Sequence, residues 1–89
     1  MDSMQKMTLI RAINYHGVEN QTKQALQEMG ELIVELERRG TDRWDRDHAA
    51  EEIADCIIMM EQLRIIYGSD MVDFWIDKKI DRLEERLNT

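Results

Sequence analysis

Apolar residues recur along the chain with the spacing of amphipathic helices, and no stretch alternates as a strand would. Three glycines separate the periodic segments: Gly17, Gly40 and Gly68. We therefore expect four helices, over about Ser3 to Tyr15, Val18 to Arg39, Asp45 or Asp47 to Tyr67, and Asp70 to Leu87. The aspartates that open the last two are expected to act as N-caps. The fold class predicted from this pattern is all-α, with a single domain over residues 1–89.

The first two helices are each expected to have one apolar face. The first helix is only weakly amphipathic, and its apolar face consists of Met7, Ile10 and Ile13. The second places Ala25, Met29, Leu32 and Leu36 on one face, at i, i+4, i+7 and i+11. Three acids border that second face on a helical wheel: Glu28, Glu31 and Glu35. We expect these acids to lie at the edge of the buried surface.

The third helix is apolar on almost every side, through a run from Ile53 to Met60 and further residues up to Ile66. A helix that is apolar all round has to be buried all round. Only three other helices are present in the chain to cover it. We therefore expect a bundle that is completed by oligomerisation, as a homodimer or a homotetramer.

A short loop between the second and third helices should make them an antiparallel hairpin. Counting outward from about Arg43, Glu31 lies twelve residues back, while Glu52 lies nine and Asp55 twelve residues forward. Two acid pairs therefore come to the same level of the hairpin: Glu28 with Glu31, and Glu52 with Asp55.

Each acid pair has i, i+3 spacing, which places Cβ atoms about 5–6 Å apart on one helical face. Four carboxylates, Glu28, Glu31, Glu52 and Asp55, are thus candidate ligands for Mg²⁺, with Mn²⁺ as a substitute. Asp55 interrupts the apolar run, so we expect it to lose much of its hydration. Gly30 lies between the first two acids, and a glycine inside a helix suggests a close approach to the backbone there.

Composition limits the possible partners and compartment. A net charge of −7 argues against binding a nucleic-acid polymer, although a bound cation would still allow a nucleotide. No apolar stretch approaches the ~20 residues of a membrane span, and the start MDSMQKM lacks the features of a secretory signal. The single cysteine, Cys56, excludes a disulfide framework and is expected to be a buried core residue. We expect a cytoplasmic protein that does not contact membranes.

The acidic segments resemble the MazG-like all-α nucleoside triphosphate pyrophosphohydrolases, a family related to the dimeric all-α dUTPases. That family carries E-E-x-x-E on one helix and E-x-x-D on the next. The corresponding segments here are Gln27-Glu28-Met29-Gly30-Glu31 and Glu52-Ile53-Ala54-Asp55, so Gln27 stands where the family often has an acid. The stretches GVENQ and KKIDRLEER are also similar to small members found in phages and their hosts, and the resemblance covers residue 17 to the C-terminus.

The resemblance implies Mg²⁺-dependent hydrolysis of a nucleoside triphosphate to the monophosphate and pyrophosphate. The implied biological role is cleansing of the nucleotide pool. The four carboxylates would hold the metal, and Glu31 or Glu35 would orient the attacking water. A basic strip on the last helix lies beside Trp75 and is a candidate phosphate clamp. Lys78, Arg82 and Arg86 line up there at i, i+4 and i+8, with Lys79 close by. Asn20 and Gln21 are candidates for hydrogen bonds to a base or sugar, although Asn20 is equally suited to cap a helix.

Two other functions remain open from the sequence. One is a non-enzymatic interaction or regulatory module that binds nucleotide without cleaving it. The other is a metal-free structural dimer, in which the acids pair with Lys78, Arg82 and Arg86 of a neighbouring chain. His16 and His48 have no partner at metal-ligand spacing and are expected to be structural.

Overall fold

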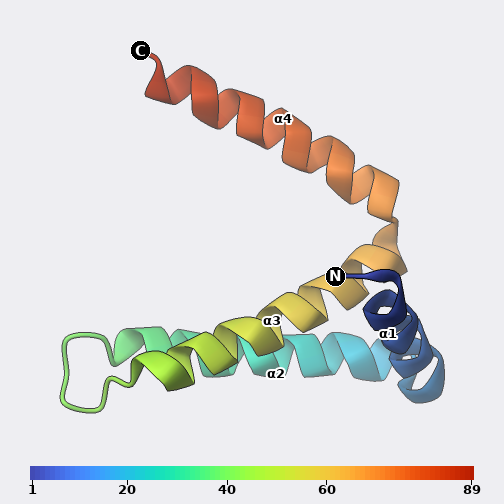
Figure 1. Ribbon diagram of the computed structural model, residues 1–89, viewed down its shortest axis with the longest axis horizontal. Helices are drawn as coiled ribbons and strands as arrows, with labels where there is room; N and C mark the ends of the chain where they lie inside the picture. Colours follow the sequence, from blue (N-terminus) through green and yellow to red (C-terminus); the bar gives the residue numbers. More distant parts are fainter.

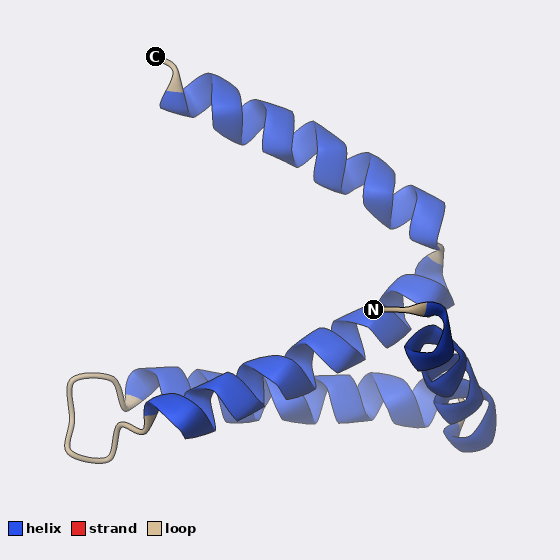
Figure 2. Cartoon of the chain, viewed as in Figure 1, coloured by secondary structure: helices blue, strands red, loops and turns tan.

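The chain forms four α-helices and no strand, in a computed structural model that describes all 89 residues (Figures 1 and 2). The helices are α1 (Ser3–His16), α2 (Val18–Glu37), α3 (Arg46–Tyr67) and α4 (Ser69–Leu87). The predicted all-α class and the number of helices are confirmed. No helix is both long and apolar enough to cross a membrane.

Local capping explains where the helices begin. Asp2 accepts a hydrogen bond from the backbone N–H of Gln5 at 2.8 Å, and the Gln5 side chain accepts one from the backbone N–H of Asp2 at 3.0 Å. Asp45 caps α3, as expected, through the backbone N–H of Asp47 at 3.0 Å. The prediction that Asp70 caps α4 is wrong, because α4 already begins at Ser69 and Asp70 lies within its first turn.

Helices α2 and α3 form the predicted antiparallel hairpin, with the connecting loop at one end (Figure 1). Helix α1 packs against both of them at the other end. Gly17 separates α1 from α2 with φ of +90°, a backbone conformation that glycine adopts without strain. Helices α1 and α4 are therefore both attached to the α2–α3 hairpin.

Small and polar side chains fill the contact between α2 and α3. Only nine residues are buried: Leu9, Gln21, Ala25, Glu35, Ala49, Glu52, Cys56, Met59 and Gln62. Ala25 on α2 and Ala49 on α3 are 1% and 4% exposed, and such small side chains allow two helices to approach closely. Gln21 Nε2 donates a hydrogen bond to Gln62 Oε1 at 2.7 Å, which satisfies two buried amides.

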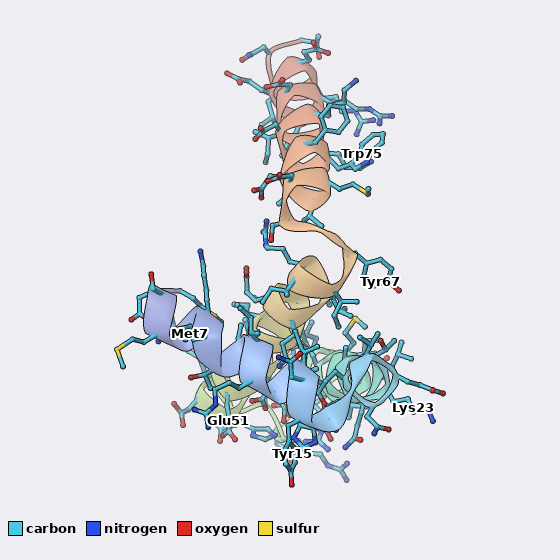
Figure 3. The ribbon with its side chains drawn as sticks, turned by 90° about the vertical axis from the view of Figure 1, so that its right-hand side faces the viewer. Met7, Tyr15, Lys23, Glu51, Tyr67 and Trp75 are labelled. Carbon is cyan, nitrogen blue, oxygen red and sulfur yellow. The ribbon has the colours of Figure 1, made fainter.

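Several predicted apolar faces are not buried within one chain. In α1 the buried residue is Leu9, whereas Ile10 and Met7, which is labelled on α1 in Figure 3, are exposed. In α2, Leu36 of the predicted apolar face is exposed. In α3, Ile53, Ile57, Ile58 and Met60 are 40–52% exposed. The predicted face of α2 is buried in part, since Ala25 is buried and Met29 and Leu32 are half-buried. Polar side chains are enclosed beside these apolar residues, among them Glu35 on α2 and Glu52 on α3.

Helix α4 leaves the hairpin as an arm (Figure 1). It contacts α3 only, and none of its residues is buried. An ion pair between Arg64 of α3 and Asp73 of α4 lies where the two helices meet. The arm therefore stands apart from the rest of the chain.

Candidate metal centre

Three of the four predicted metal ligands come together across the hairpin. Glu28 and Glu31 of α2 and Glu52 of α3 each offer a carboxylate oxygen, and these oxygens lie within 4.8 Å of one another. We call these three residues the acidic cluster. Asp55 lies one turn further along α3, half-buried and outside this group. The antiparallel register thus produces the convergence that residue counting predicted.

Desolvation of Glu28 and Glu52 disfavours the charged form of their carboxylates. Desolvation raises the pKa of Glu52, which is 8% exposed, and the charge of Glu31 raises it further. Desolvation also raises the pKa of Glu28, although a hydrogen bond from Gln24 Nε2 at 2.8 Å opposes this. Asp55 adds to both shifts through its charge. Asp55, which was expected to lose much of its hydration, is half-buried, and the more deeply buried carboxylate of α3 is Glu52.

The cluster has the chemistry of a site for a hard cation. Glu28 Oε2 and Glu52 Oε2 are buried and have no hydrogen-bond partner. Such orphaned oxygens are costly unless a cation or proton satisfies them. All available ligands are oxygens, which suits Mg²⁺, and Glu31 is exposed, so the site opens to solvent. The residues present therefore fit a divalent cation.

Cys56 lies beside the cluster but does not belong to it. Its Sγ donates a hydrogen bond to the backbone oxygen of Glu28 at 3.3 Å. Burial and the nearby carboxylates raise the pKa of the thiol, so it remains protonated. It is a buried core residue, as expected.

A second group of side chains behind the cluster was not predicted. His48 Nε2 lies 3.5 Å from Glu35 Oε2 and 3.5 Å from Glu52 Oε1. Glu35 is 2% exposed and also pairs with Arg38 Nη1 at 3.2 Å. Glu35 therefore lies inside the helix contact rather than at its edge, and His48 links it to Glu52. The sequence could have predicted this contact. Counted from Arg43 in the loop, Glu35 lies eight residues back and His48 five residues forward, so both lie near the loop end of the hairpin.

The residues around Gly30 are arranged differently from the expectation. A Cβ atom at Gly30 would have no neighbour within 4 Å, so the predicted close approach does not exist within the chain. The Nε2 atom of the exposed Gln27 donates a hydrogen bond to Glu31 Oε1 at 3.4 Å. Gln27 thus contacts one of the cluster carboxylates.

The predicted substrate-binding residues do not reach the acidic cluster in one chain. Lys78, Lys79, Arg82 and Trp75 line one hollow on α4, which makes no contact with α2. Gln21 is engaged with Gln62, and Asn20 Nδ2 donates to the backbone oxygen of His16 at 2.9 Å. Gly17 occupies the N-cap position of α2, so Asn20 is not a cap.

The raised pKa values of Glu28 and Glu52 predict how metal-free stability depends on pH. Because the folded state holds protons above the ordinary value of 4.5, the free energy of unfolding should fall as pH rises through the folded pKa values. Urea denaturation at a series of pH values above about 5 measures this slope. The double variant Glu28→Gln/Glu52→Gln should flatten it, and an unchanged slope would show that other groups are responsible.

No family model, curated protein or solved structure matches the chain. The acidic cluster and the sequence pattern that forms it are therefore the basis for a functional proposal.

Proposed function

We propose that the protein is a Mg²⁺-dependent nucleoside triphosphate pyrophosphohydrolase of the MazG-like kind, which cleaves an NTP or dNTP to the monophosphate and pyrophosphate. The observation that supports this most directly is the convergence of Glu28, Glu31 and Glu52. These residues come from the two segments that carry the resemblance. The buried oxygens of Glu28 and Glu52 that lack a hydrogen-bond partner would be satisfied by a bound cation.

Each carboxylate has a proposed role. Glu28 and Glu52 would hold Mg²⁺, and Asp55, one turn further along α3, would be a further ligand. When bound there, Mg²⁺ or Mn²⁺ would supply positive charge against the triphosphate and would lower the pKa of a water. Of the two candidates for orienting that water we propose Glu31, since its side chain is exposed whereas Glu35 is enclosed.

Neighbouring polar groups orient these carboxylates. His48 lies between Glu35 and Glu52 and limits the positions that the Glu52 carboxylate can adopt. Gln27 does the same for Glu31 by donating a hydrogen bond. Groups that orient metal ligands commonly affect metal affinity about 10–100-fold when removed.

Substrate contacts and assembly belong to the same proposal. The α4 residues Lys78, Lys79, Arg82 and Trp75 would bind the phosphates and base from a second copy, since their own cluster is out of reach. The exposed apolar residues of α3 support a homodimer or homotetramer. A cytoplasmic location, where such triphosphates occur, is part of this proposal.

The test is to incubate the purified protein with a panel of canonical and damaged nucleotides. We expect pyrophosphate release that depends on Mg²⁺ and that chelation abolishes. We also expect Mg²⁺ alone to raise the melting temperature, because it binds only where folding has assembled the carboxylates. Calorimetric titration measures the affinity independently of turnover.

Two results would contradict the proposal in different ways. Binding of Mg²⁺ and nucleotide without pyrophosphate release would instead identify a nucleotide-binding module. No Mg²⁺ binding at millimolar concentration would remove the metal site itself, and would favour a dimer held together by the acids.

A further inference from the structure

A triphosphate bound at the acidic cluster would need more positive charge than one metal ion supplies. The cluster is itself negative, through Glu28, Glu31 and Glu52, and a complex of Mg²⁺ with a triphosphate keeps a net negative charge. Proteins that act on phosphoryl groups commonly meet this charge with arginine or lysine in addition to the metal. A basic side chain near the cluster is therefore expected.

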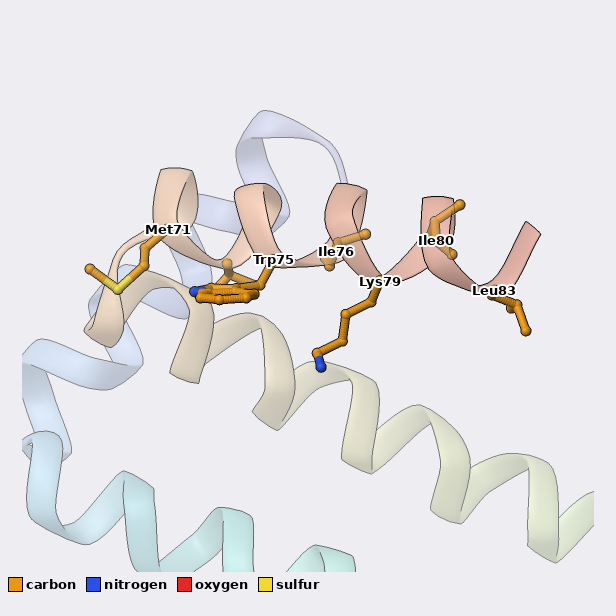
Figure 4. Close-up of a pocket in the computed structure, with 7 residues that line it drawn as sticks. Met71, Trp75, Ile76, Lys79, Ile80 and Leu83 are labelled. Atoms are coloured by element: carbon orange, nitrogen blue, oxygen red, sulfur yellow. The ribbon is translucent and has the colours of Figure 1, made fainter. Parts of the chain in front are cut away.

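Helix α4 does not bring such a side chain to the cluster of its own chain. In Figure 4, Lys79 extends from α4 beside Trp75, among the apolar side chains of a groove. Helix α4 contacts α3 alone, whereas two of the three cluster carboxylates belong to α2. The basic residues of the hairpin itself are the next candidates.

Arg38 lies on the same side of α2 as the exposed carboxylate of the acidic cluster. It follows Glu31 by seven residues, which is about two helical turns, and follows Glu35 by three. The backbone of Arg38 is still helical, with φ of −75° and ψ of −10°, so the side chain leaves α2 in the direction that this spacing gives. Arg38 therefore continues the row of cluster residues toward the loop.

Three short contacts join the Arg38 guanidinium to the acidic cluster. Arg38 Nη1 donates a hydrogen bond to Glu35 Oε2 at 3.2 Å. His48 Nε2 lies 3.5 Å from that same oxygen and 3.5 Å from Glu52 Oε1. Laid end to end, these contacts set an upper limit on the distance from Arg38 Nη1 to Glu52 Oε1. That limit is comparable to the length of a triphosphate, so one ligand can reach both.

The Arg38 guanidinium is held in place but is not fully used. Glu35 is the only carboxylate that pairs with it, and 40% of the Arg38 side chain is exposed. An arginine carries five N–H donors in a planar fork that matches the oxygens of a phosphate. The buried carboxylate of Glu35 thus fixes one nitrogen and leaves the others free to meet a ligand.

We infer, on the basis of the proposed function, that Arg38 binds the phosphates that leave as pyrophosphate. A bound triphosphate then extends along α2 from the acidic cluster toward the loop. Hydrolysis breaks the bond between the α-phosphorus and the oxygen that bridges it to the β-phosphorus, while water supplies the new P–O bond and releases a proton. The electron pair of the broken bond stays with the pyrophosphate, and Arg38 meets its increased negative charge with charge-assisted hydrogen bonds.

Calorimetric titration with pyrophosphate at saturating Mg²⁺, beside titration with Mg²⁺ alone, tests this contact. In Arg38→Gln we expect the affinity for pyrophosphate to fall roughly 10- to 100-fold, the loss that corresponds to hydrogen bonds with a charged group. The affinity for Mg²⁺ alone should not fall, because Arg38 is not a ligand. Arg38→Lys keeps the charge but not the planar fork, so its affinity for pyrophosphate should lie between those of the parent and Arg38→Gln.

The matched control is Arg39→Gln, which removes the same charge one residue further along the chain. Arg39 lies beyond the end of α2 and is exposed, so its replacement should leave the affinity for pyrophosphate nearly unchanged. Lys23→Gln is the control for the opposite half of α2. Lys23 Nζ lies 3.9 Å from Glu19 Oε1 with 70% of its side chain exposed, and its replacement should also have little effect.

Several results would overturn the inference. They are an absence of pyrophosphate binding by the parent, an unchanged affinity in Arg38→Gln, and an equal loss in Arg39→Gln or Lys23→Gln. Equal losses of Mg²⁺ and pyrophosphate affinity in Arg38→Gln would also overturn it, since Arg38 would then act only by holding Glu35. If Arg38→Gln is unfolded by circular dichroism, Arg38→Lys decides, and a parent-like affinity for pyrophosphate would overturn the inference.

The same variants separate this contact from the proposed function. Hydrolysis of a nucleoside triphosphate by Arg38→Gln with the kcat/KM of the parent would overturn the contact and leave the proposed function intact. Pyrophosphate binding that depends on Arg38, without hydrolysis of any nucleotide in the panel, would support the contact and count against the function.

Discussion

Replacing Glu52 with glutamine should remove most Mg²⁺ binding and lower any nucleotide hydrolysis by orders of magnitude. The amide keeps the shape of the side chain but is a weak ligand for a hard cation. The metal-free protein should be as stable as the parent or more so, because a buried carboxylate with raised pKa and an unpartnered oxygen disappears. Calorimetric titration with Mg²⁺ and urea denaturation measure the two effects separately.

Glu51→Gln is the matched control for this variant. Glu51 precedes Glu52 directly but is exposed, so the same chemical change should leave both Mg²⁺ affinity and stability nearly unchanged. A strong loss of metal-free stability in Glu52→Gln would mean that the charge of Glu52 is needed by His48. The cluster would then be a structural ion pair and not a metal site.

Ala49→Leu should force α2 and α3 apart. Ala49 is enclosed between the helices, and the larger side chain should lower the free energy of unfolding by about 1–3 kcal/mol. For a domain of this size each kcal/mol corresponds to roughly 4–8 °C in melting temperature. Because Glu52 lies three residues further along the same face, Mg²⁺ affinity should fall as well. Thermal denaturation and calorimetric titration measure both.

Ala50→Leu is the matched control, because it makes the same chemical change at a neighbouring position outside the helix contact. Ala50 is exposed on α3, and leucine is a good helix former, so stability should change by no more than about 0.5 kcal/mol. Equal losses in the two variants would show that the hairpin is not held together by the close approach at Ala49.

The positions of the helices followed from the sequence because their causes are local. Apolar spacing with a period near 3.6 defines each helix, and glycines with positive φ at residues 17 and 68 end α1 and α3. The sequence also predicts that the two acid pairs lie at the same height along the hairpin, because a short loop leaves two antiparallel helices little freedom of register. These constraints predict that Glu28 and Glu31 lie level with Glu52, and in the structure the three carboxylates come together.

Which face of each helix turns inward was decided only by the tertiary structure. Periodicity tells which residues share a face, but burial depends on contacts with residues far away in the chain. Ala25 and Ala49 allow α2 and α3 to approach along a stripe of mixed small, apolar and polar side chains, so Glu35 and Glu52 are enclosed while Ile33 and Ile57 remain outside. The same approach places His48 between Glu35 and Glu52. A local pattern does not encode these pairings, because each depends on two helices meeting at one particular distance and rotation.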